Sequence, residues 1–374
     1  MPEHEGGESR WAWLYLGAMI AAFAAYLAGL YLLDRGGAVG QRKAVIVLAC
    51  AIQLLPLAGP VLLSTDVYTY WDYARISTVY GDNPYVDLPS DYPADVAYPL
   101  MGSYWHDTTS VYGPGFTLAS EGHAAIVGES VDAAAWAYRA LAAAAMVALV
   151  LLAVRLAPRA AFAAAFVGWN PLLAIHFAGG GHNDAWMMVF VLAALALAAA
   201  GRPALAGLSW AAAIAIKWVP LLFLPLRLLE ARRTGRRIDH RGLALGAVVV
   251  VSVATWRYGL DWLGAVGPLA QNLAEDRASY AIPSRIASLG LPEDAVTVVF
   301  AIVFVVAYAW LLREAWRGRA RLALTAGLLL VCTSWLVPWY AVWAVPLAAV
   351  EEDRTARLLA LALSAYLLRD AVPI

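Results

Sequence analysis

Residues 203 to 229 read PALAGLSWAAAIAIKWVPLLFLPLRLL, an apolar run interrupted near its middle by the sequence KWVP at residues 217 to 220. Basic residues flank the run at both ends, at Arg202 and from Arg232 onward. Because basic connections stay in the cytoplasm, both ends of the run lie on the same side, and a single crossing of the bilayer is excluded. Proline breaks helices, and a break at membrane depth is tolerated where it lines a protein-buried or water-filled cavity. The sequence therefore predicts two short helices that rise to the outer face and return.

A second apolar run has the same character. Residues 320 to 350 are also flanked by basic residues and are interrupted at Pro338, Trp339 and Tyr340. We expect a second broken hairpin whose break faces the same cavity. The arms of both hairpins are shorter than the roughly 20 residues of a full span, which implies local thinning of the bilayer or tilt.

The composition places the chain in a membrane. Of its 374 residues 62% are hydrophobic and 14% charged, against roughly half and a quarter in soluble domains. Residues 11 to 33 lack the basic start and cleavage site of a signal peptide, so we expect a retained helix. Cys50 and Cys332 lie in apolar runs and indicate no disulfide. A net charge of −1 without a basic stripe argues against nucleic acid as a partner.

The remaining apolar runs predict an all-α, multi-pass bundle forming one domain, residues 1 to 374. With the two hairpins we expect about twelve crossings. Basic connections on the cytoplasmic side leave two exoplasmic loops, residues 64 to 130 and 259 to 293, and we expect interfacial helices in the first. The other runs occupy residues 11 to 33, 44 to 63, 131 to 156, 160 to 178, 185 to 200, 242 to 258, 294 to 312 and 358 to 372.

The first exoplasmic loop opens with STDVYTYWDY at residues 64 to 73. Helical spacing from Asp66 places Tyr70 and Tyr73 near one face, which sets a carboxylate beside an aromatic wall suited to sugar rings. The alternative is that Thr65 or Asp66 only caps an interfacial helix and that the tyrosines form an aromatic belt. The sequence alone leaves both interpretations open.

A second polar cluster, GGGHND at residues 179 to 184, joins two apolar helices. Polar residues this close to a membrane are costly, which favours a function, although Asn183 or Asp184 as a helix cap is the alternative. Asn170 and His176 on the preceding helix each need a partner in lipid. The His and Asp spacing does not match that of metalloenzymes, so we predict no metal.

Cationic residues near the outer face are candidates for binding phosphate. Lys217 sits in an apolar run and needs an anionic partner; it either holds a lipid phosphate or snorkels to headgroups. In the second loop Arg257, Arg277 and Arg285 are further candidates, since guanidinium binds phosphate oxygens in a bidentate fork. The pair His106 and Asp107 offers an acid and a base, with solvated loop residues as the alternative. These assignments remain open at this point.

The order of the short motifs resembles that of GT-C glycosyltransferases, most closely the polyprenyl-phosphate-mannose-dependent mannosyltransferases. The resemblance covers residues 60 to 350 and differs in having two helices before Asp66. It rests on Asp66-Val67-Tyr68, Asn83-Pro84-Tyr85, Tyr112-Gly113-Pro114, Asn170-Pro171, Gly181-His182-Asn183-Asp184, Lys217 before Pro220, and Pro338-Trp339-Tyr340.

The resemblance implies inverting transfer of a sugar, mannose first, from a polyprenyl-phosphate donor to a glycan or glycolipid acceptor, without a cofactor, at the exoplasmic face of the cell membrane. Asp66 matches the catalytic base of the family. The rival interpretation is a transporter or flippase of lipid-linked sugars, because broken helices with a buried lysine also mark transporters. We assign donor phosphate to Lys217, Arg285 and His182, and substrate binding to Tyr70, Trp71, Asn183, Asp184, Trp339 and Tyr340.

Overall fold

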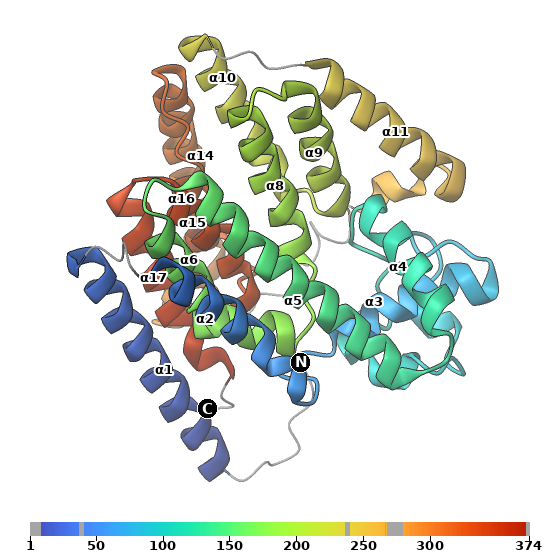
Figure 1. Cartoon of the computed structure of the whole chain (residues 1–374). Helices are drawn as coiled ribbons and strands as arrows, with labels where there is room; N and C mark the ends of the chain where they lie inside the picture. Colours follow the sequence, from blue (N-terminus) through green and yellow to red (C-terminus); the bar gives the residue numbers. More distant parts are fainter. Residues whose placement is uncertain (1–8, 37–40, 236–239, 266, 268–279, 372–374) are drawn as a thin grey trace.

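The computed structural model describes residues 9–36, 41–235, 240–265, 267 and 280–371. In these ranges the regular secondary structure is entirely helical, as predicted (Figure 1). Three helices are long and apolar enough to cross a bilayer: α1 (Ser9–Gly36), α5 (Val131–Leu156) and α14 (Glu293–Trp316). The chain is thus a helical membrane protein, while the count of twelve crossings stays a prediction.

The predicted apolar run from 160 to 178 is helical but bent, because the chain turns by 54° between α6 (Ala160–Gly168) and the helical segment Pro171–Gly179. Asn170 Oδ1 accepts a hydrogen bond from Leu172 N at 3.1 Å and so caps a new helix. Proline in the first helical position has no N–H to lose and a φ angle suited to a helix start. The bent pair α6, α7 (Pro171–Ala174) and η6 (Ile175–Gly179) counts as a fourth span if taken together.

The first predicted hairpin breaks where the sequence placed the break. Helix α9 (Pro203–Ile216) ends at Lys217, whose backbone is extended at φ −155° and ψ 146°. The short turn η7 (Val219–Leu222) leads into α10 (Leu224–Thr234). Pro220 lies in the first part of that turn, where its missing N–H costs no helical hydrogen bond. The expected interruption is confirmed.

The second hairpin breaks earlier than predicted. Helix α15 (Leu322–Cys332) ends six residues before Pro338, and η9 (Pro338–Trp343) and α16 (Val345–Val350) follow. The Thr333 hydroxyl donates to Trp335 O at 3.0 Å and accepts from Trp335 N at 3.2 Å. Threonine side chains that bond nearby backbone groups compete with the helix ladder, which explains the early end.

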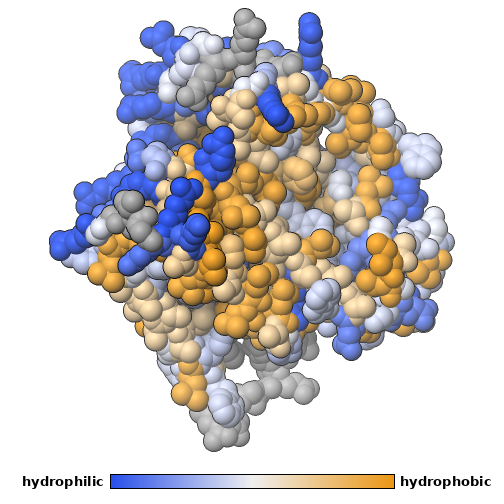
Figure 2. All heavy atoms as spheres, in the orientation of Figure 1, coloured by the Kyte–Doolittle hydropathy of each residue, from blue (hydrophilic) through white to orange (hydrophobic). Residues whose placement is uncertain are grey.

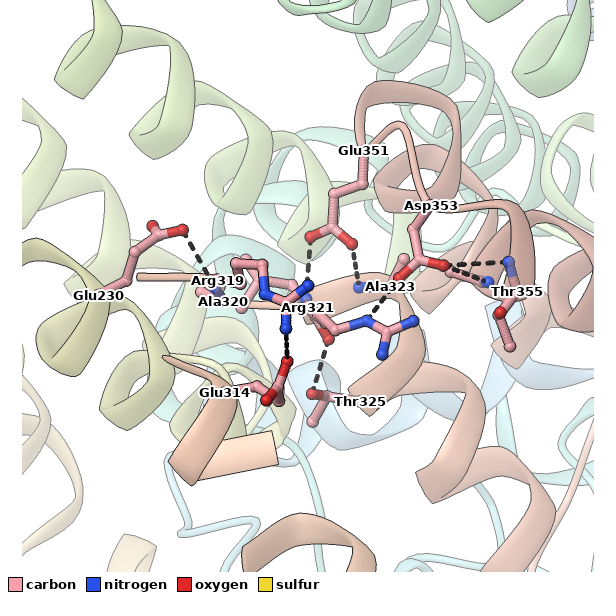
Figure 3. A network of polar contacts seen from close by, with 12 residues as sticks. Glu230, Glu314, Arg319, Ala320, Arg321, Ala323, Thr325, Glu351, Asp353 and Thr355 are labelled. Atoms are coloured by element: carbon pink, nitrogen blue, oxygen red, sulfur yellow. Dashed lines mark hydrogen bonds and ion pairs between the residues drawn. The ribbon is translucent and has the colours of Figure 1, made fainter. Parts of the chain in front are cut away.

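Carboxylates tie the bases of the two hairpins together (Figure 3). Glu351, directly after α16, accepts from the backbone N–H groups of Leu322 at 2.8 Å and Ala323 at 3.1 Å. These N–H groups open α15 and have no partner inside that helix. Glu230 of α10 accepts from Ala320 N at 3.0 Å. The arms of the second hairpin are therefore held to each other and to the first hairpin at the end opposite their breaks.

The loop from 64 to 130 is ordered around a buried ion pair. It contains α3 (Asp66–Arg75) and α4 (Pro114–Val127) with short turns between them. Arg75 Nε lies 2.7 Å from Asp95 Oδ1, with side chains 5% and 2% exposed, and Arg75 also donates to Gly128 O. A buried charge needs such a partner, so Arg75 holds the middle of the loop, at Asp95, and its end, at Gly128, to α3.

Helix α11 (His240–Tyr258) connects the end of the molecule where α10 lies to the region of α4 (Figure 1). Beside α4, at the C-terminal end of α11, Asn83 Nδ2 donates to Tyr258 O at 3.0 Å, and Arg257 Nε donates to Glu121 Oε2 at 3.0 Å. The start of the second predicted outer loop, η8 (Asp261–Ala265), follows directly. The start of the second predicted outer loop therefore lies beside Asn83 and Glu121 of the first.

Much of the surface is apolar. Figure 2 shows a broad hydrophobic area across the middle of one face, with hydrophilic side chains gathered at the top and left and at the right. On α14 the exposed side chains include Val298, Ile302 and Val305, between 56% and 65% exposed. A broad, contiguous apolar surface is rare in soluble monomers and marks contact with lipid or protein. Because these residues lie on a helix long enough to span, lipid is the natural cover.

Arg139 anchors the segments that lead to the polar clusters. It lies in α5 and is 4% exposed. Its guanidinium donates to Ala178 O at 2.9 Å, Pro56 O at 2.6 Å and Gly59 O at 2.8 Å. One side chain thus satisfies carbonyls from two segments that are distant in sequence, and fixes the chain at Pro56 to Gly59 and at Ala178.

We predict that Arg139→Ala destabilises the protein by about 2 to 3 kcal/mol, because hydrogen bonds to a charged donor are lost and buried carbonyls are left unpaired. Thermal unfolding of the purified protein in detergent measures the change. Arg155→Ala is the matched control, since Arg155 lies on the same helix but is exposed. Equal melting temperatures for the two variants would contradict the anchoring role.

Candidate active site

Asp66 is the first residue of α3, and its carboxylate is not used to cap that helix. Ser64 Oγ accepts from Asp66 N at 3.1 Å, and Thr65 makes no side-chain capping bond. Leu63, just before, has a positive φ of 63°, which is uncommon for a bulky residue. The capping alternative for Asp66 therefore fails, and its side chain, 16% exposed, is free for other partners.

Two side chains hold the Asp66 carboxylate. The Tyr70 hydroxyl donates to Asp66 Oδ2 at 3.3 Å, one helical turn along α3, which confirms the predicted shared face. His182 Nδ1 lies 3.1 Å from the same oxygen. Tyr70 packs edge-on against Tyr112 and Phe116, with ring centroids 5.1 and 4.9 Å away. The carboxylate thus stands at the edge of an aromatic wall.

The electrostatics keep Asp66 ionised. Burial by itself raises the pKa of the Asp66 carboxyl, but the hydrogen bond from His182 and the positive charges of His182 and Lys217 outweigh that effect. The net pKa of Asp66 lies below its usual value. At neutral pH the group is a carboxylate able to accept a proton.

A glycine turn brings His182 to α3. Gly181 has a φ of +74°, and a Cβ on it would lie 2.4 Å from Val67 Cγ1. Both the left-handed backbone and the close approach require glycine here. His182 itself is fully buried and stacks on Trp339 of η9, with ring centroids 3.7 Å apart and planes 11° apart. The second hairpin break is therefore in direct contact with the partner of Asp66.

Lys217, at the first hairpin break, pairs with Asp184 at the start of α8 (Asp184–Ala199). Its Nζ lies 2.7 Å from Asp184 Oδ1, to which Trp343 Nε1 also donates at 2.7 Å. Lys217 further lies over the ring of Tyr340, 4.8 Å from the centroid. Since Asn183 makes no capping bond and Asp184 is used for the ion pair, the capping alternative fails for this cluster too.

The segment Tyr112-Gly113-Pro114-Gly115 packs against the end of α9 beside Lys217. Gly113 N donates to Ile216 O at 3.2 Å, and a Cβ on Gly113 would lie 2.2 Å from Ala215 O. A Cβ on Gly115 would also clash, at 2.8 Å from Ala215 Cβ. These glycines permit backbone-to-backbone contact, which sets the loop from 64 to 130 on the break between α9 and η7.

Two predicted site residues lie apart from this cluster. Trp71 is fully buried, with the Arg75 guanidinium over its ring at 5.1 Å, on the side of α3 away from Asp66. Arg285, in α13 (Ile282–Ala287), is exposed and lies over the Tyr280 ring at 5.5 Å. Within the described ranges no hydrogen bond or ion pair joins Arg285 to Asp66, His182 or Lys217.

The weaker candidates are likewise engaged elsewhere. Arg257 binds Glu121 and Ser77 O and so serves the packing of α11 on α4. His106 stacks on Tyr98, with ring centroids 4.1 Å apart, and Asp107 is exposed. Arg277 lies outside the described residues.

Several buried polar atoms around the cluster have no hydrogen-bond partner among the described residues. They are Asn183 Oδ1 and Nδ2, Asp184 Oδ2, His182 Nε2 and both ring nitrogens of His176. Buried polar atoms are normally satisfied, so a set of unsatisfied ones at one place indicates a site for a polar ligand or water. Asn170, by contrast, donates to Ser364 Oγ at 3.1 Å and has the partner that the sequence required.

The sequence interpretation missed Trp343, which binds Asp184 and stacks on Tyr340 with centroids 3.9 Å apart. Trp343 lies three residues after Tyr340 in the sequence, and this spacing could have indicated that the two side chains lie on the same side of the segment. In the part of the chain that the structure describes, His, Cys, Asp and Glu form no group of three suited to a metal ion.

The family model and the known proteins that match this chain all carry the same kind of name. A family model for "Alpha-(1->6)-mannopyranosyltransferase, N-terminal domain" matches residues 3–232. The chain is 26% identical to a probable alpha-(1->6)-mannopyranosyltransferase of Mycolicibacterium smegmatis, over 89% of this chain and 69% of that protein. It is 29% identical to alpha-(1->6)-mannopyranosyltransferase A of Mycobacterium tuberculosis, over 56% of this chain and 44% of that protein. No solved structure matches.

The Corynebacterium glutamicum alpha-(1->6)-mannopyranosyltransferase A is 28% identical over 63% of this chain and 52% of its own length. The chain thus spans 44% to 69% of the length of these three relatives. The family match covers more than half of the chain and includes Asp66, His182, Asp184 and Lys217. The chain therefore belongs to the alpha-(1->6)-mannopyranosyltransferase family, which confirms the resemblance to mannosyltransferases.

Proposed function

We propose that the protein transfers a mannosyl group from a polyprenyl-phosphate donor to a hydroxyl of a glycan or glycolipid acceptor, with inversion at the anomeric carbon. The observation that carries this function is an ionised Asp66 held in one cluster with the cation Lys217. The names of the relatives support mannose as the sugar. The basic connections support an exoplasmic site, because they lie at the helix ends opposite the hairpin breaks.

Asp66 is the general base. Inverting transfer needs one carboxylate that accepts the proton of the attacking hydroxyl while the phosphate leaves from the other side of the sugar. Tyr70 and His182 both contact Oδ2 of Asp66. A carboxylate offers about four lone-pair positions, so these contacts orient the group and leave it able to bind the acceptor hydroxyl.

Lys217 stabilises the leaving phosphate. An ammonium group has three donors, one of which is used by Asp184. The side chain is 17% exposed, so its other donors reach an anionic ligand in the cluster. A positioned cation at a developing charge is among the strongest catalytic effects. Arg285 is not needed for this role, and His182 acts on Asp66.

The unpaired polar atoms provide the sugar site. Asn183 offers a buried amide with both atoms free among the described residues, and hexose hydroxyls both donate and accept hydrogen bonds. Trp339 and Tyr340 stand beside His182 and Lys217 and supply aromatic faces of the kind that pack on sugar rings. The transporter alternative has no comparable support, since the relatives are transferases.

We predict that Asp66→Asn lowers turnover at least about a hundredfold, because a general base contributes about 10² to 10⁴ in rate. Donor binding persists, since the amide keeps the shape of the carboxylate. The assay follows mannosyl transfer from polyprenyl-phosphate mannose to a mannoside acceptor by mass, with purified protein in lipid. Glu129→Gln, an exposed charge change in the same loop, is the control. Wild-type turnover in Asp66→Asn would remove the assigned base.

His182→Gln tests the positioning role through pH. Loss of the imidazole removes a hydrogen bond and a charge that lower the pKa of Asp66, while burial still raises it. The pKa of Asp66 then rises, and because the reaction needs the carboxylate, the acid limb of the pH–rate profile moves to higher pH. His240→Gln, an exposed change, leaves the profile in place. An unshifted limb in His182→Gln would mean that His182 has only a packing role.

Lys217→Met lowers kcat by about 10² to 10³, the cost of removing one group that stabilises transition-state charge, whereas Lys217→Arg retains part of the rate. The Met variant also strands the buried Asp184 carboxylate and loses stability. The double variant Lys217→Met with Asp184→Asn separates the two effects: its melting temperature recovers and its rate does not. Recovery of the rate would show that Lys217 is only the counter-ion of Asp184.

A further inference from the structure

A hollow lies at the C-terminal end of α8, whereas Asp184 and the cluster around Asp66 lie at the N-terminal end of that helix. It has a volume of about 480 Å³ and is walled by α8, α9, α10 and α11. Helix α8 has 16 residues, so Asp184 and this hollow, which we call the inner cavity, stand roughly 20 Å apart at 1.5 Å per residue. The inner cavity is thus separate from the proposed active site and unused by the mechanism.

The walls of the inner cavity are mostly apolar, apart from Arg227, and are made partly of small residues. They include Gly207, Trp210 and Leu228, with Ala198 and Ala199 at the rim. Both rim alanines are exposed, so the cavity opens to the surface of the molecule. Protein interiors hold few voids larger than a water molecule. A hollow of about 480 Å³ falls in the range of ligand sites, roughly 300 to 1,000 Å³.

The space is not a general packing defect of these helices. On the neighbouring face of α9 a Cβ on Gly246 of α11 would lie 2.6 Å from Ala211 Cβ, and one on Gly242 would lie 2.0 Å from Ala204 O. The two helices therefore touch closely through glycines beside the cavity. Since tight packing is achieved there, the adjoining hollow is a feature of the fold.

Three arginines lie next to wall residues of the inner cavity in the chain. Arg202 precedes Pro203 of the cavity wall, and Arg232 and Arg233 follow Ala231, another wall residue. All three arginines are exposed, and none has an acidic partner among the residues that the structure describes. Arg227, by contrast, is in the wall itself and pairs with Glu230. These three exposed arginines are therefore next to wall residues in the chain and are available to an anion.

We propose that the inner cavity binds one hydrocarbon chain of an anionic phospholipid, with the lipid phosphate among Arg202, Arg232 and Arg233. An apolar hollow at membrane depth offers water few hydrogen-bond partners, whereas a lipid chain matches its walls. Arginine binds phosphate oxygens in a bidentate fork. The basic connections place this rim at the headgroups of the predicted cytoplasmic leaflet, where anionic lipids attract basic residues.

Native mass spectrometry of the full-length chain, delipidated in detergent, tests the assignment. Phosphatidylglycerol is titrated against phosphatidylcholine with identical acyl chains. We expect one phosphatidylglycerol per chain to bind several-fold more tightly than phosphatidylcholine. Arg202→Gln weakens phosphatidylglycerol about fivefold, as expected for one arginine near an anionic lipid, while Arg155→Gln, an exposed charge on α5, does not.

Ala199→Phe places a ring across the rim without disturbing a buried position, and it abolishes the tight binding. Ala25→Phe on the exposed face of α1 is the matched control and leaves the binding intact. Equal affinities for the two lipids, or unchanged binding in Ala199→Phe, would overturn the proposal. Displacement of phosphatidylglycerol by equimolar polyprenyl phosphate would do so as well, because the cavity would then hold the donor chain.

Discussion

A lysine ammonium that is only 17% exposed, at the end of an apolar helix, needs an anion beside it, and the rest of the site follows from how this chain meets that need. Lys217 stands where α9 stops, and its anion, Asp184, is the first residue of α8. Trp343 from the second hairpin binds the same carboxylate. One ion pair thus joins three segments far apart in sequence, and breaking it leaves a buried charge uncompensated.

The same junction explains why Asp66 is a usable base. His182 precedes Asp184 by two residues, so the turn that delivers Asp184 to Lys217 also delivers His182 to Asp66. Gly181 makes this possible, since its left-handed backbone allows the turn to lie on Val67. The Trp339 stack then closes over His182. The hydrogen bonds and charges around Asp66 keep its pKa below the usual value in a place where burial alone would raise it.

The far ends of the hairpins are held by different chemistry. Glu351 and Glu230 accept backbone N–H groups at the base of the second hairpin, so the breaks are set against a fixed frame. The inner cavity lies at this same end, under Arg202 and beside α10. A lipid chain in that space would complete the packing of helices whose opposite ends carry the polar cluster, joining membrane composition to the stability of the site.

Hydropathy and helical spacing are local properties, so the amino-acid sequence predicted the membrane class, the break at Lys217, the shared face of Asp66 and Tyr70, and the polar turn from 179 to 184. It did not predict the bend at Asn170, the early end of α15, the burial of Trp71 or the distance of Arg285. The pairing of cations with carboxylates depends on packing, since Lys217 has several acidic candidates in sequence and the fold brings Asp184 to it. Pairing between distant segments depends on how helices approach one another, and glycines such as Gly113 and Gly181 control that approach through contacts that no local pattern records.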